Sequence, residues 1–318
     1  MAHLADLEAA ADLVHRSVPP TPQIAWPLLA ERCGCEVWVK HENHTPIAAF
    51  KVRGGLVYVD DLARSKPEVA GVVTATRGNH GQSVAFAARA RGLRAVIVVP
   101  HGNSVEKNCA MRALGAEIIE HGHDFNAAYD HARELAETRG LHMLPSFHPL
   151  LVRGVASYGL ELFSARDDLD AVYVPIGMGS GACATLVARE ALGRRAAIIG
   201  VVAERANAYA LSFAAGEPVA TNSADTLADG LAVRVPDPQA LDIIRAGVER
   251  IVTVGEDEIL AAMGHYFTDT HNIAEGAGAA PLAALLKERE IMRGRKVALI
   301  LSGGNLDRAL YLRALGAT

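Results

Sequence analysis

Lys51 is the residue of this chain with the clearest catalytic potential, because three segments downstream are suited to hold one cofactor around it. A lysine amine can form a Schiff base when burial or neighbouring charge lowers its pKa. In isolation, a lysine before Val52 would be expected to be a solvated surface charge. The accompanying segments change that expectation, and they are Arg77-Gly78-Asn79-His80-Gly81-Gln82, Gly177-Met178-Gly179-Ser180-Gly181 and Ser302-Gly303-Gly304-Asn305.

The glycine-rich segment that follows the apolar run 171–175 has the composition of an anion site. Gly177, Gly179 and Gly181 allow backbone N–H groups to converge on one point, and the start of a helix adds partial positive charge. The third glycine of a dinucleotide fingerprint is missing, and so is the Gly-Lys-Ser/Thr end of a Walker loop. The segment therefore indicates a small phosphate-bearing ligand.

Taken together, the order and separation of these four segments resemble the fold type II pyridoxal-phosphate enzymes, and among them the serine/threonine dehydratase and serine racemase branch. The resemblance implies that Lys51 carries pyridoxal 5'-phosphate and, once released from it, removes the Cα proton of the substrate. It also implies ring contacts from Phe50, Asn79 and Ser302. The implied phosphate contacts come from Gly177, Met178, Gly179, Ser180 and Gly181.

The loop Thr76-Arg77-Gly78-Asn79-His80 precedes a predicted helix, where backbone amides are placed to bind a carboxylate. By itself it could equally be an ordinary turn with an asparagine cap, whereas the resemblance makes it the substrate-binding loop. Relatives usually carry serine or alanine where Arg77 stands, and in the racemases that serine is the second acid/base. An arginine stays protonated at neutral pH and is a poor proton shuttle, which disfavours racemisation.

Other departures from the family pattern concern the substrate pocket. The lysine motif usually reads Pro-Thr-Gly-Ser-Phe-Lys, and here Ala48 and Ala49 replace its glycine and serine. Val155 and Ala156 replace the glutamine and second glycine of a Gly-Gln-Gly-Thr stretch. Fewer polar groups near the substrate side chain would suit an apolar or aromatic β-substituent, such as that of a phenylserine-like amino acid.

A divalent cation, Mg²⁺ or Mn²⁺, is bound by many relatives beyond their phosphate loop. Glu204 and the carbonyl group of Ala208 match two of its ligands, but Ala210 stands where a carboxylate is expected. Hard cations need oxygen ligands, so the loss of a charged one should weaken this metal site. Glu275 is a further candidate, which either acts near the cofactor or stabilises a helix start.

Composition restricts the class of protein. A chain of 318 residues suggests two domains. A net charge of -5 without a long basic run argues against nucleic-acid binding. There is no apolar run of about 18 residues and no basic segment leading into an apolar core at the N-terminus, so we expect a cytoplasmic protein without a membrane span. Four cysteines are too few for a disulfide scaffold.

Strands and helices alternate with short turns, which favours parallel sheets covered on both faces. One block should contain strands 71–75, 94–99 and 117–120, helices 81–91 and 124–138, and a helix capped by Asn103 that runs towards Leu114, with a short closing strand at 143–145. A second series should contain strands 171–175, 196–202 and 296–301. The resemblance implies a tryptophan synthase β-like α/β fold of two three-layer domains, in which a small domain (71–147) is inserted in a large one (1–70 and 148–318).

The leading expectation is a pyridoxal-phosphate-dependent ammonia-lyase of the threonine/serine dehydratase type. It would convert a small β-hydroxy-α-amino acid to a 2-keto acid and ammonia, and the resemblance implies a homodimer. Two alternatives stay open from the sequence. One is an amino-acid racemase of the serine racemase type, and the other is a non-catalytic protein that binds a phosphorylated metabolite in the glycine loop.

Overall fold

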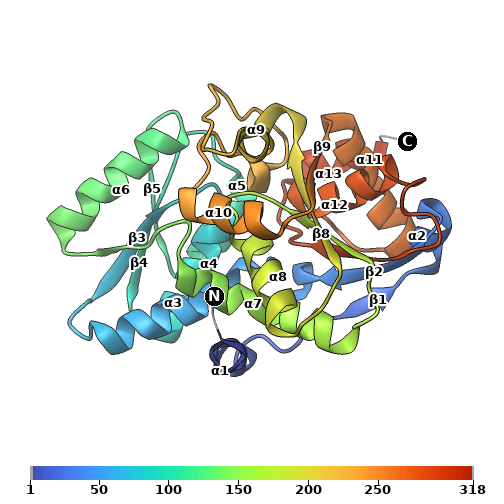
Figure 1. The fold of residues 1–318 in the computed structure, drawn as a ribbon. Helices are drawn as coiled ribbons and strands as arrows, with labels where there is room; N and C mark the ends of the chain where they lie inside the picture. Colours follow the sequence, from blue (N-terminus) through green and yellow to red (C-terminus); the bar gives the residue numbers. More distant parts are fainter. Residues whose placement is uncertain (1–2, 317–318) are drawn as a thin grey trace.

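The computed structural model describes residues 3–316, which form two β-sheets with helices on both faces of each (Figure 1). The larger sheet has the order β1-β2-β10-β7-β8-β9 and is parallel except for β1. Its strands are β1 (Gln23–Ala25), β2 (Glu36–His41), β7 (Ala171–Pro175), β8 (Ala197–Ala203), β9 (Arg250–Val254) and β10 (Lys296–Leu301).

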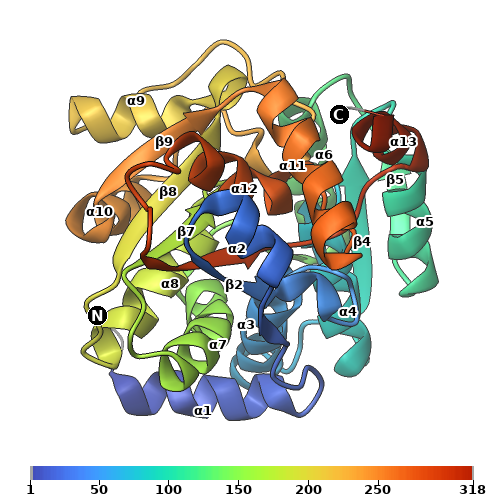
Figure 2. The ribbon, with the colours of Figure 1, turned by 90° about the vertical axis from the view of Figure 1, so that its right-hand side faces the viewer.

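Two apolar clusters cover the larger sheet, one on each face. One face carries α2 (Pro27–Cys33), α11 (Glu256–Thr270) and α12 (Gly276–Lys287), with α13 (Arg308–Gly316) packed on α11. The other carries α7 (Pro149–Ala165), α8 (Ser180–Ala191) and α10 (Pro238–Gly247), with α9 (Ala208–Ala215) beside α10 and α1 (Leu4–His15) beside α7 (Figure 2). Within residues 3–316, no helix is long and apolar enough to cross a membrane.

The smaller sheet is parallel and has the order β5-β4-β3-β6. Its strands are β3 (Gly71–Ala75), β4 (Arg94–Val99), β5 (Glu117–Glu120) and β6 (His142–Met143). One face packs on α3 (Lys51–Ser65), α4 (Asn79–Ala90) and α5 (Val105–Ala113), and the other on α6 (Phe125–Arg139). Because parallel strands present their carboxyl ends at one edge, the βα loops of each sheet gather on one side.

These elements confirm the predicted α/β class, and the differences from the expected elements are local. The helix expected to be capped by Asn103 is capped instead by Ser104, whose Oγ accepts from the N–H of Lys107 at 3.1 Å. Strands β1, β2 and β9 were not expected, and β6 is shorter than the expected strand at 143–145. Helix α3 belongs to the expected large domain but packs in the core of the smaller sheet, so the domain boundaries stay a prediction.

A buried ionic network fixes the first turn of α3. The guanidinium of Arg53 is fully buried, and it donates to Glu42 at 2.7 Å and to Glu161 at 2.6 Å. Lys40 from β2 donates to the same Glu161 at 2.5 Å, and Nε2 of His15 from α1 lies 2.8 Å from Oε1 of Glu161. Buried charges are stable only when they are paired. The network therefore ties α1, β2 and α7 to the turn that begins with Lys51.

Candidate active site

The segment before Lys51 is held by main-chain bonds to the segment after β10. Ala49 pairs with Gly303 in an isolated antiparallel bridge, and the N–H of Phe50 donates to the carbonyl of Ser302 at 3.0 Å. The N–H of Gly304 donates to the carbonyl of Ala48 at 2.9 Å. These bonds bring the lysine segment and the serine segment of the sequence together, although 250 residues separate them.

The amine of Lys51 is half-buried and lines a pocket between the two sheets. Its Nζ donates to the hydroxyl of Ser180 at 3.3 Å and lies 5.3 Å from the centre of the Phe50 ring. Burial lowers the pKa of Lys51 to about 8, and the charge of Glu275 partly opposes this effect. A larger fraction of this amine is therefore neutral near physiological pH than for a surface lysine.

The glycine loop joins β7 to α8 and forms a cradle of backbone amides. Gly179 has φ 96°, a conformation that favours glycine, and a side chain at Gly177 would collide with the carbonyl oxygen of Gly230. The first N–H group near the start of α8 with a backbone acceptor is that of Cys183, which donates to Gly179 at 2.9 Å. The earlier amides of this helix start are left for an anion.

The predicted substrate loop joins β3 to α4 and has a similar geometry. The N–H of Gly78 donates to the hydroxyl of Thr76 at 3.0 Å, which fixes the turn. In α4, the N–H of Gln82 donates to the carbonyl of Gly78 at 3.1 Å, so the amides of residues 79–81 precede the first helical bond. These amides lie at the edge of the same pocket, and amides at a helix start are suited to bind an anion.

His80 contributes a buried imidazole to this pocket. Its Nε2 atom has no hydrogen-bond partner within residues 3–316. Burial, followed by the charge of Lys51, lowers the pKa of His80 to about 3. The ring is therefore neutral at physiological pH, and an unpartnered buried nitrogen is typical of a ligand-binding site.

Asn79 is held at the pocket by two partners. Its Nδ2 donates to Oε1 of Glu275 at 2.7 Å, and its Oδ1 accepts from Asn305 at 2.9 Å. Glu275 is buried, which raises its pKa, while the charge of Lys107 and the bond from Asn79 oppose the increase. The amide of Asn79 is therefore oriented by residues of the larger sheet.

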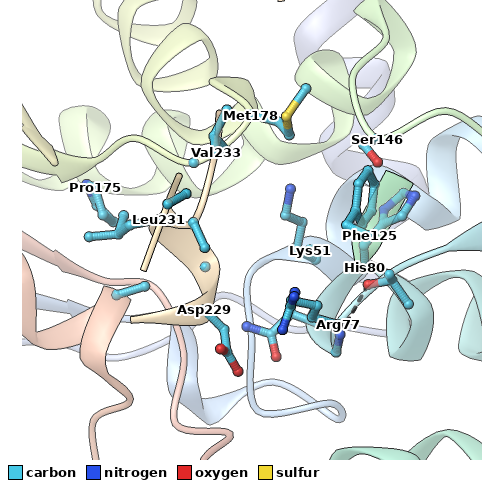
Figure 3. A pocket seen from close by; sticks show the side chains of 18 of the residues that line it. Lys51, Arg77, His80, Phe125, Ser146, Pro175, Met178, Asp229, Leu231 and Val233 are labelled. Atoms are coloured by element: carbon cyan, nitrogen blue, oxygen red, sulfur yellow. Dashed lines mark hydrogen bonds between the residues drawn. The ribbon is translucent and has the colours of Figure 1, made fainter. Parts of the chain in front are cut away.

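The pocket has a volume of about 560 Å³ and brings together the predicted cofactor and substrate residues (Figure 3). In the view of Figure 3, the amine of Lys51 lies between Met178 and Val233 on one side and Arg77 and Asp229 on the other. All predicted residues of these two groups line it, namely Phe50, Lys51, Thr76, Arg77, Gly78, Asn79, His80, Gly177, Met178, Gly179, Ser180, Gly181 and Ser302.

The structure separates other predicted residues from the pocket. Val155 and Ala156 lie in α7 and are buried in the apolar core, so they do not set the polarity of the substrate site. Because their side chains pack against other helices, these two residues give no support to the prediction of an apolar β-substituent, which stays a prediction.

The predicted metal ligands Glu204 and Ala208 also lie outside the pocket. The carbonyl of Ala208 accepts from the hydroxyl of Ser212 at 2.7 Å. No group of three or more His, Cys, Asp or Glu residues that could hold a metal ion occurs in the described range 3–316. The divalent cation stays a prediction, and the geometry around Glu204 gives it no support.

Several pocket residues were missed by the sequence reasoning. Lys107 from α5 donates to Asp229 at 2.9 Å, and this pair lines the pocket from opposite sheets. Phe125, Leu231 and Val233 supply apolar surface. Asp229 lies in the segment Thr226-Leu227-Ala228-Asp229-Gly230, and neither Lys107 nor Phe125 carries a local sequence signal.

The residues present fit a phosphorylated pyridine aldehyde. A reactive amine (Lys51), a cradle without side chains (Gly177–Gly181) and a buried neutral hydroxyl (Ser302) line one pocket, and the aromatic ring of Phe50 lies beside the amine. The cradle suits the phosphate and the amine suits the aldehyde. The anion-binding start of α4 remains for the carboxylate of a substrate.

Comparisons with known proteins agree with this geometry. The family model described as "Pyridoxal-phosphate dependent enzyme" matches residues 14–303. The L-threonine ammonia-lyase of Thermotoga maritima is 33% identical over 308 residues, which cover 96% of this chain and 76% of that protein. The biosynthetic L-threonine dehydratase of Pasteurella multocida is 34% identical over 88% of this chain, and the chain spans only 55% of its length.

Solved structures are similar over nearly the whole chain. The processed form of threonine deaminase isoform 2 from Solanum lycopersicum has a TM-score of 0.92 and 30% identity, with coverage of 99% of this chain and 92% of that one. The family match covers far more than half of the chain. The chain therefore belongs to the family of pyridoxal-phosphate-dependent enzymes.

Proposed function

We propose that this protein is an ammonia-lyase that converts a β-hydroxy-α-amino acid of the threonine or serine type to a 2-keto acid and ammonia. The observation that carries the proposal is the half-buried amine of Lys51, with a pKa near 8, at the centre of the pocket. Relatives named L-threonine ammonia-lyase and L-threonine dehydratase support the choice of substrate class.

Pyridoxal phosphate, when bound, supplies an electron sink for charge that develops at the substrate Cα. The amine of Lys51 acts as the base that takes the Cα proton, because its lowered pKa allows a neutral amine at physiological pH. The hydroxyl group at Cβ then leaves, and it takes up a proton to depart as water. Hydrolysis of the product gives the keto acid and ammonia.

The remaining pocket residues bind and orient. The amides at the start of α4 hold the α-carboxylate of the substrate, which aligns Cα with the amine of Lys51. The side chain of Ser302 is a buried neutral hydroxyl, and it leaves a pyridine nitrogen beside it unprotonated more readily than a carboxylate would. This arrangement favours elimination of the β-hydroxyl over transamination.

Racemisation is the main alternative within the same chemistry. A racemase needs a second acid/base on the face opposite Lys51, and Arg77 occupies the loop position where relatives carry that residue. A guanidinium does not release its proton at neutral pH. A non-catalytic phosphometabolite-binding protein would have no use for the lowered pKa of Lys51. A binding protein predicts no keto acid from any hydroxy amino acid, whereas a racemase predicts that exchange between L- and D-serine outpaces elimination.

A keto-acid release screen tests the proposal. Purified protein loaded with pyridoxal phosphate is supplied with L-serine, L-threonine, the 3-hydroxyaspartates and the phenylserines, and exchange between L- and D-serine is followed in parallel. We expect Lys51→Ala to lower kcat by about 10³-fold, whereas Lys66→Ala, an exposed lysine at the end of the same helix, should leave kcat unchanged. Full activity in Lys51→Ala would show that the assignment is wrong.

The oligomeric state and the cellular location are inferred from the family resemblance alone. We infer a homodimer that acts in the cytoplasm. Sedimentation of the purified protein tests the first point, because a dimer should have twice the mass of the 33.6 kDa chain. A monomer with full activity would exclude an obligate dimer.

A further inference from the structure

The guanidinium of Arg77 lies at the wall of the active-site pocket and has no hydrogen-bond partner among residues 3–316. Its side chain is exposed in the loop between β3 and α4. Within residues 3–316, no side chain or carbonyl group forms a hydrogen bond or ion pair with it, whereas Arg234, the other arginine of the pocket wall, donates to the carbonyl of Thr221 at 3.2 Å. A guanidinium offers five donors in a planar fork that matches a carboxylate.

The neighbouring carboxylates have other partners. Asp229 accepts from Lys107 at 2.9 Å, and Glu275 accepts from Asn79 at 2.7 Å. The stem of Lys107 lies against Gly78, where an added Cβ would be 2.5 Å from its Cδ, so Lys107 lies directly beside the Arg77 loop. These two carboxylates, and Asp307 of the adjoining cavity, which accepts from Ser104, are bonded to residues other than Arg77, so the donors of its guanidinium remain for a ligand.

The α-carboxylate of a substrate does not require Arg77. The start of α4 already provides the amides of residues 79–81 for it. Arg77 also lines an adjoining cavity of about 220 Å³, which shares Lys107, Asp229 and Glu275 with the main pocket. A group that extends from the substrate Cβ towards this second cavity would meet the guanidinium.

We propose that Arg77 binds a carboxylate in the side chain of the substrate, so that the preferred substrate is a β-hydroxy-α-amino dicarboxylic acid. This inference rests on the proposed ammonia-lyase function and specifies its substrate class. The shortest member of the class is 3-hydroxyaspartate, whose elimination product hydrolyses to a four-carbon dicarboxylic keto acid and ammonia. Arg77 is then a specificity-determining residue, while Lys51 remains the base.

The apolar residues of the pocket support a competing preference. Phe125, Met178, Leu231 and Val233 line the pocket and would accommodate a phenyl group. An aromatic substituent would gain from area burial, and a cation over its ring would add only about 0.5–2 kcal/mol. A bidentate pair with a carboxylate is the stronger use of an otherwise unpaired guanidinium. Phenylserine is therefore an arm of the test.

Kinetics of the holoenzyme give the first measurement. We expect 3-hydroxyaspartate to have a higher kcat/KM than threonine or phenylserine. Arg77→Gln should lower kcat/KM for 3-hydroxyaspartate by about 100-fold, the effect of a hydrogen bond to a charged group, with a change of less than about threefold for threonine. Arg77→Lys should retain part of the preference, and Arg234→Gln, the matched pocket arginine, should retain all of it.

Ligand binding gives a second measurement that does not depend on turnover. Calorimetric titration of the holoenzyme compares succinate with butyrate, which has the same carbon number but one carboxylate. We expect wild-type protein to bind succinate at least about tenfold more tightly. Arg77→Gln should abolish the difference and Arg234→Gln should not.

The outcomes separate the two proposals. If no hydroxy amino acid releases keto acid but succinate is still preferred through Arg77, the ammonia-lyase proposal fails and the anion site stands. If threonine is deaminated while succinate and butyrate bind equally, or if phenylserine is preferred and Arg77→Gln changes nothing, the dicarboxylate inference is wrong. A loss of pyridoxal-phosphate affinity in Arg77→Gln with unchanged succinate preference would also overturn it, because Arg77 would then serve the cofactor.

Discussion

The amine of Lys51 donates to the hydroxyl of Ser180 at 3.3 Å, which joins the first residue of α3 to the first residue of α8. Ser180 belongs to the glycine loop, so the reactive amine lies directly beside the anion cradle. A ligand that bears both a phosphate and an aldehyde could therefore contact the cradle and the amine at the same time. The two helix starts are therefore placed as one binding unit, although their helices pack on different sheets.

The pKa of Lys51 leads to a prediction on pH. Because burial lowers this pKa to about 8, half of the amine should be neutral at about pH 8 and nearly all of it above about pH 9. The rate at which protein free of cofactor binds pyridoxal phosphate covalently should have its midpoint at about pH 8 and level off above about pH 9. An ordinary lysine, with a pKa of about 10.4, would keep gaining rate up to pH 10. Borohydride reduction followed by mass spectrometry measures the modified fraction.

Glu275→Gln provides the control for this profile. The charge of Glu275 raises the pKa of Lys51, so its removal should move the midpoint to lower pH. The exposed Lys66 provides an internal standard in the same protein. A profile for Lys51 that coincides with that of Lys66 would contradict the burial argument.

Gly177→Ala tests the anion cradle. The added methyl group would collide with the carbonyl of Gly230, so the loop must move and its amides should no longer converge. We expect the Kd for pyridoxal phosphate to rise by at least about tenfold, which corresponds to about 1.4 kcal/mol. Gly193→Ala, at the other end of α8, meets no atom within 4 Å; its φ of 62° should cost stability, but this Kd should stay unchanged. Absorbance titration provides both values, and equal affinities in the two variants would exclude a cradle at Gly177.

Ala48→Gly should stabilise the protein. Ala48 has φ 51°, which costs an L-residue about 1–2 kcal/mol relative to glycine. Glycine also increases the entropy of the unfolded chain, so we expect a net gain of about 0.5–1 kcal/mol in the free energy of unfolding. Ala49→Gly, in which a fully buried methyl group is lost without relief of φ, should instead cost about 1 kcal/mol. Urea denaturation distinguishes these opposite signs, and destabilisation by Ala48→Gly would show that φ is not strained.

Arg53→Met tests the ionic network under α3. Removal of the guanidinium leaves Glu42 and Glu161 buried with too few partners, which should lower the free energy of unfolding by about 3–5 kcal/mol. Arg64→Met on the same helix breaks a pair with Asp60 at 3.0 Å, but the Arg64 side chain is 71% exposed. It should therefore cost less than about 1 kcal/mol. Similar losses in urea denaturation would mean that the network adds nothing beyond surface pairing.

The sequence predicted those parts of the site that depend on residue type at one position. Gly177 must be glycine because the carbonyl of Gly230 approaches it closely, and Gly179 because its φ is positive, so both can be recognised from the sequence. Lys107 and Asp229 form their pair across the two sheets, from helix α5 and from a loop of the larger sheet. No local pattern distinguishes such a lysine from a surface lysine, and the pair was therefore missed.

The unexpected strands have a related explanation. In β2, Lys40 and His41 are buried, because they face the ionic network and the ring of Trp26 rather than solvent. Buried polar residues of this kind interrupt the apolar run by which a central strand is recognised. Strand β9 is an edge strand with mostly half-buried residues, which weakens its pattern. Asn103 and Ser104 are both good caps, so local preference could not choose between them.

The lysine segment contributes backbone atoms to its attachment to the serine segment: the bridge from Ala49 to Gly303, the bonds from Phe50 to Ser302 and from Gly304 to Ala48, and the carbonyl of Ile47, which accepts from the side chain of Asn305 at 2.8 Å. Mutations that alter side chains in this segment therefore leave its anchoring intact. A lineage could exchange the side chains of residues 47–49 while it inherits the position of the reactive amine unchanged. In this fold, the main-chain bonds that position the lysine segment must be conserved, whereas the side chains of the segment are free to diverge.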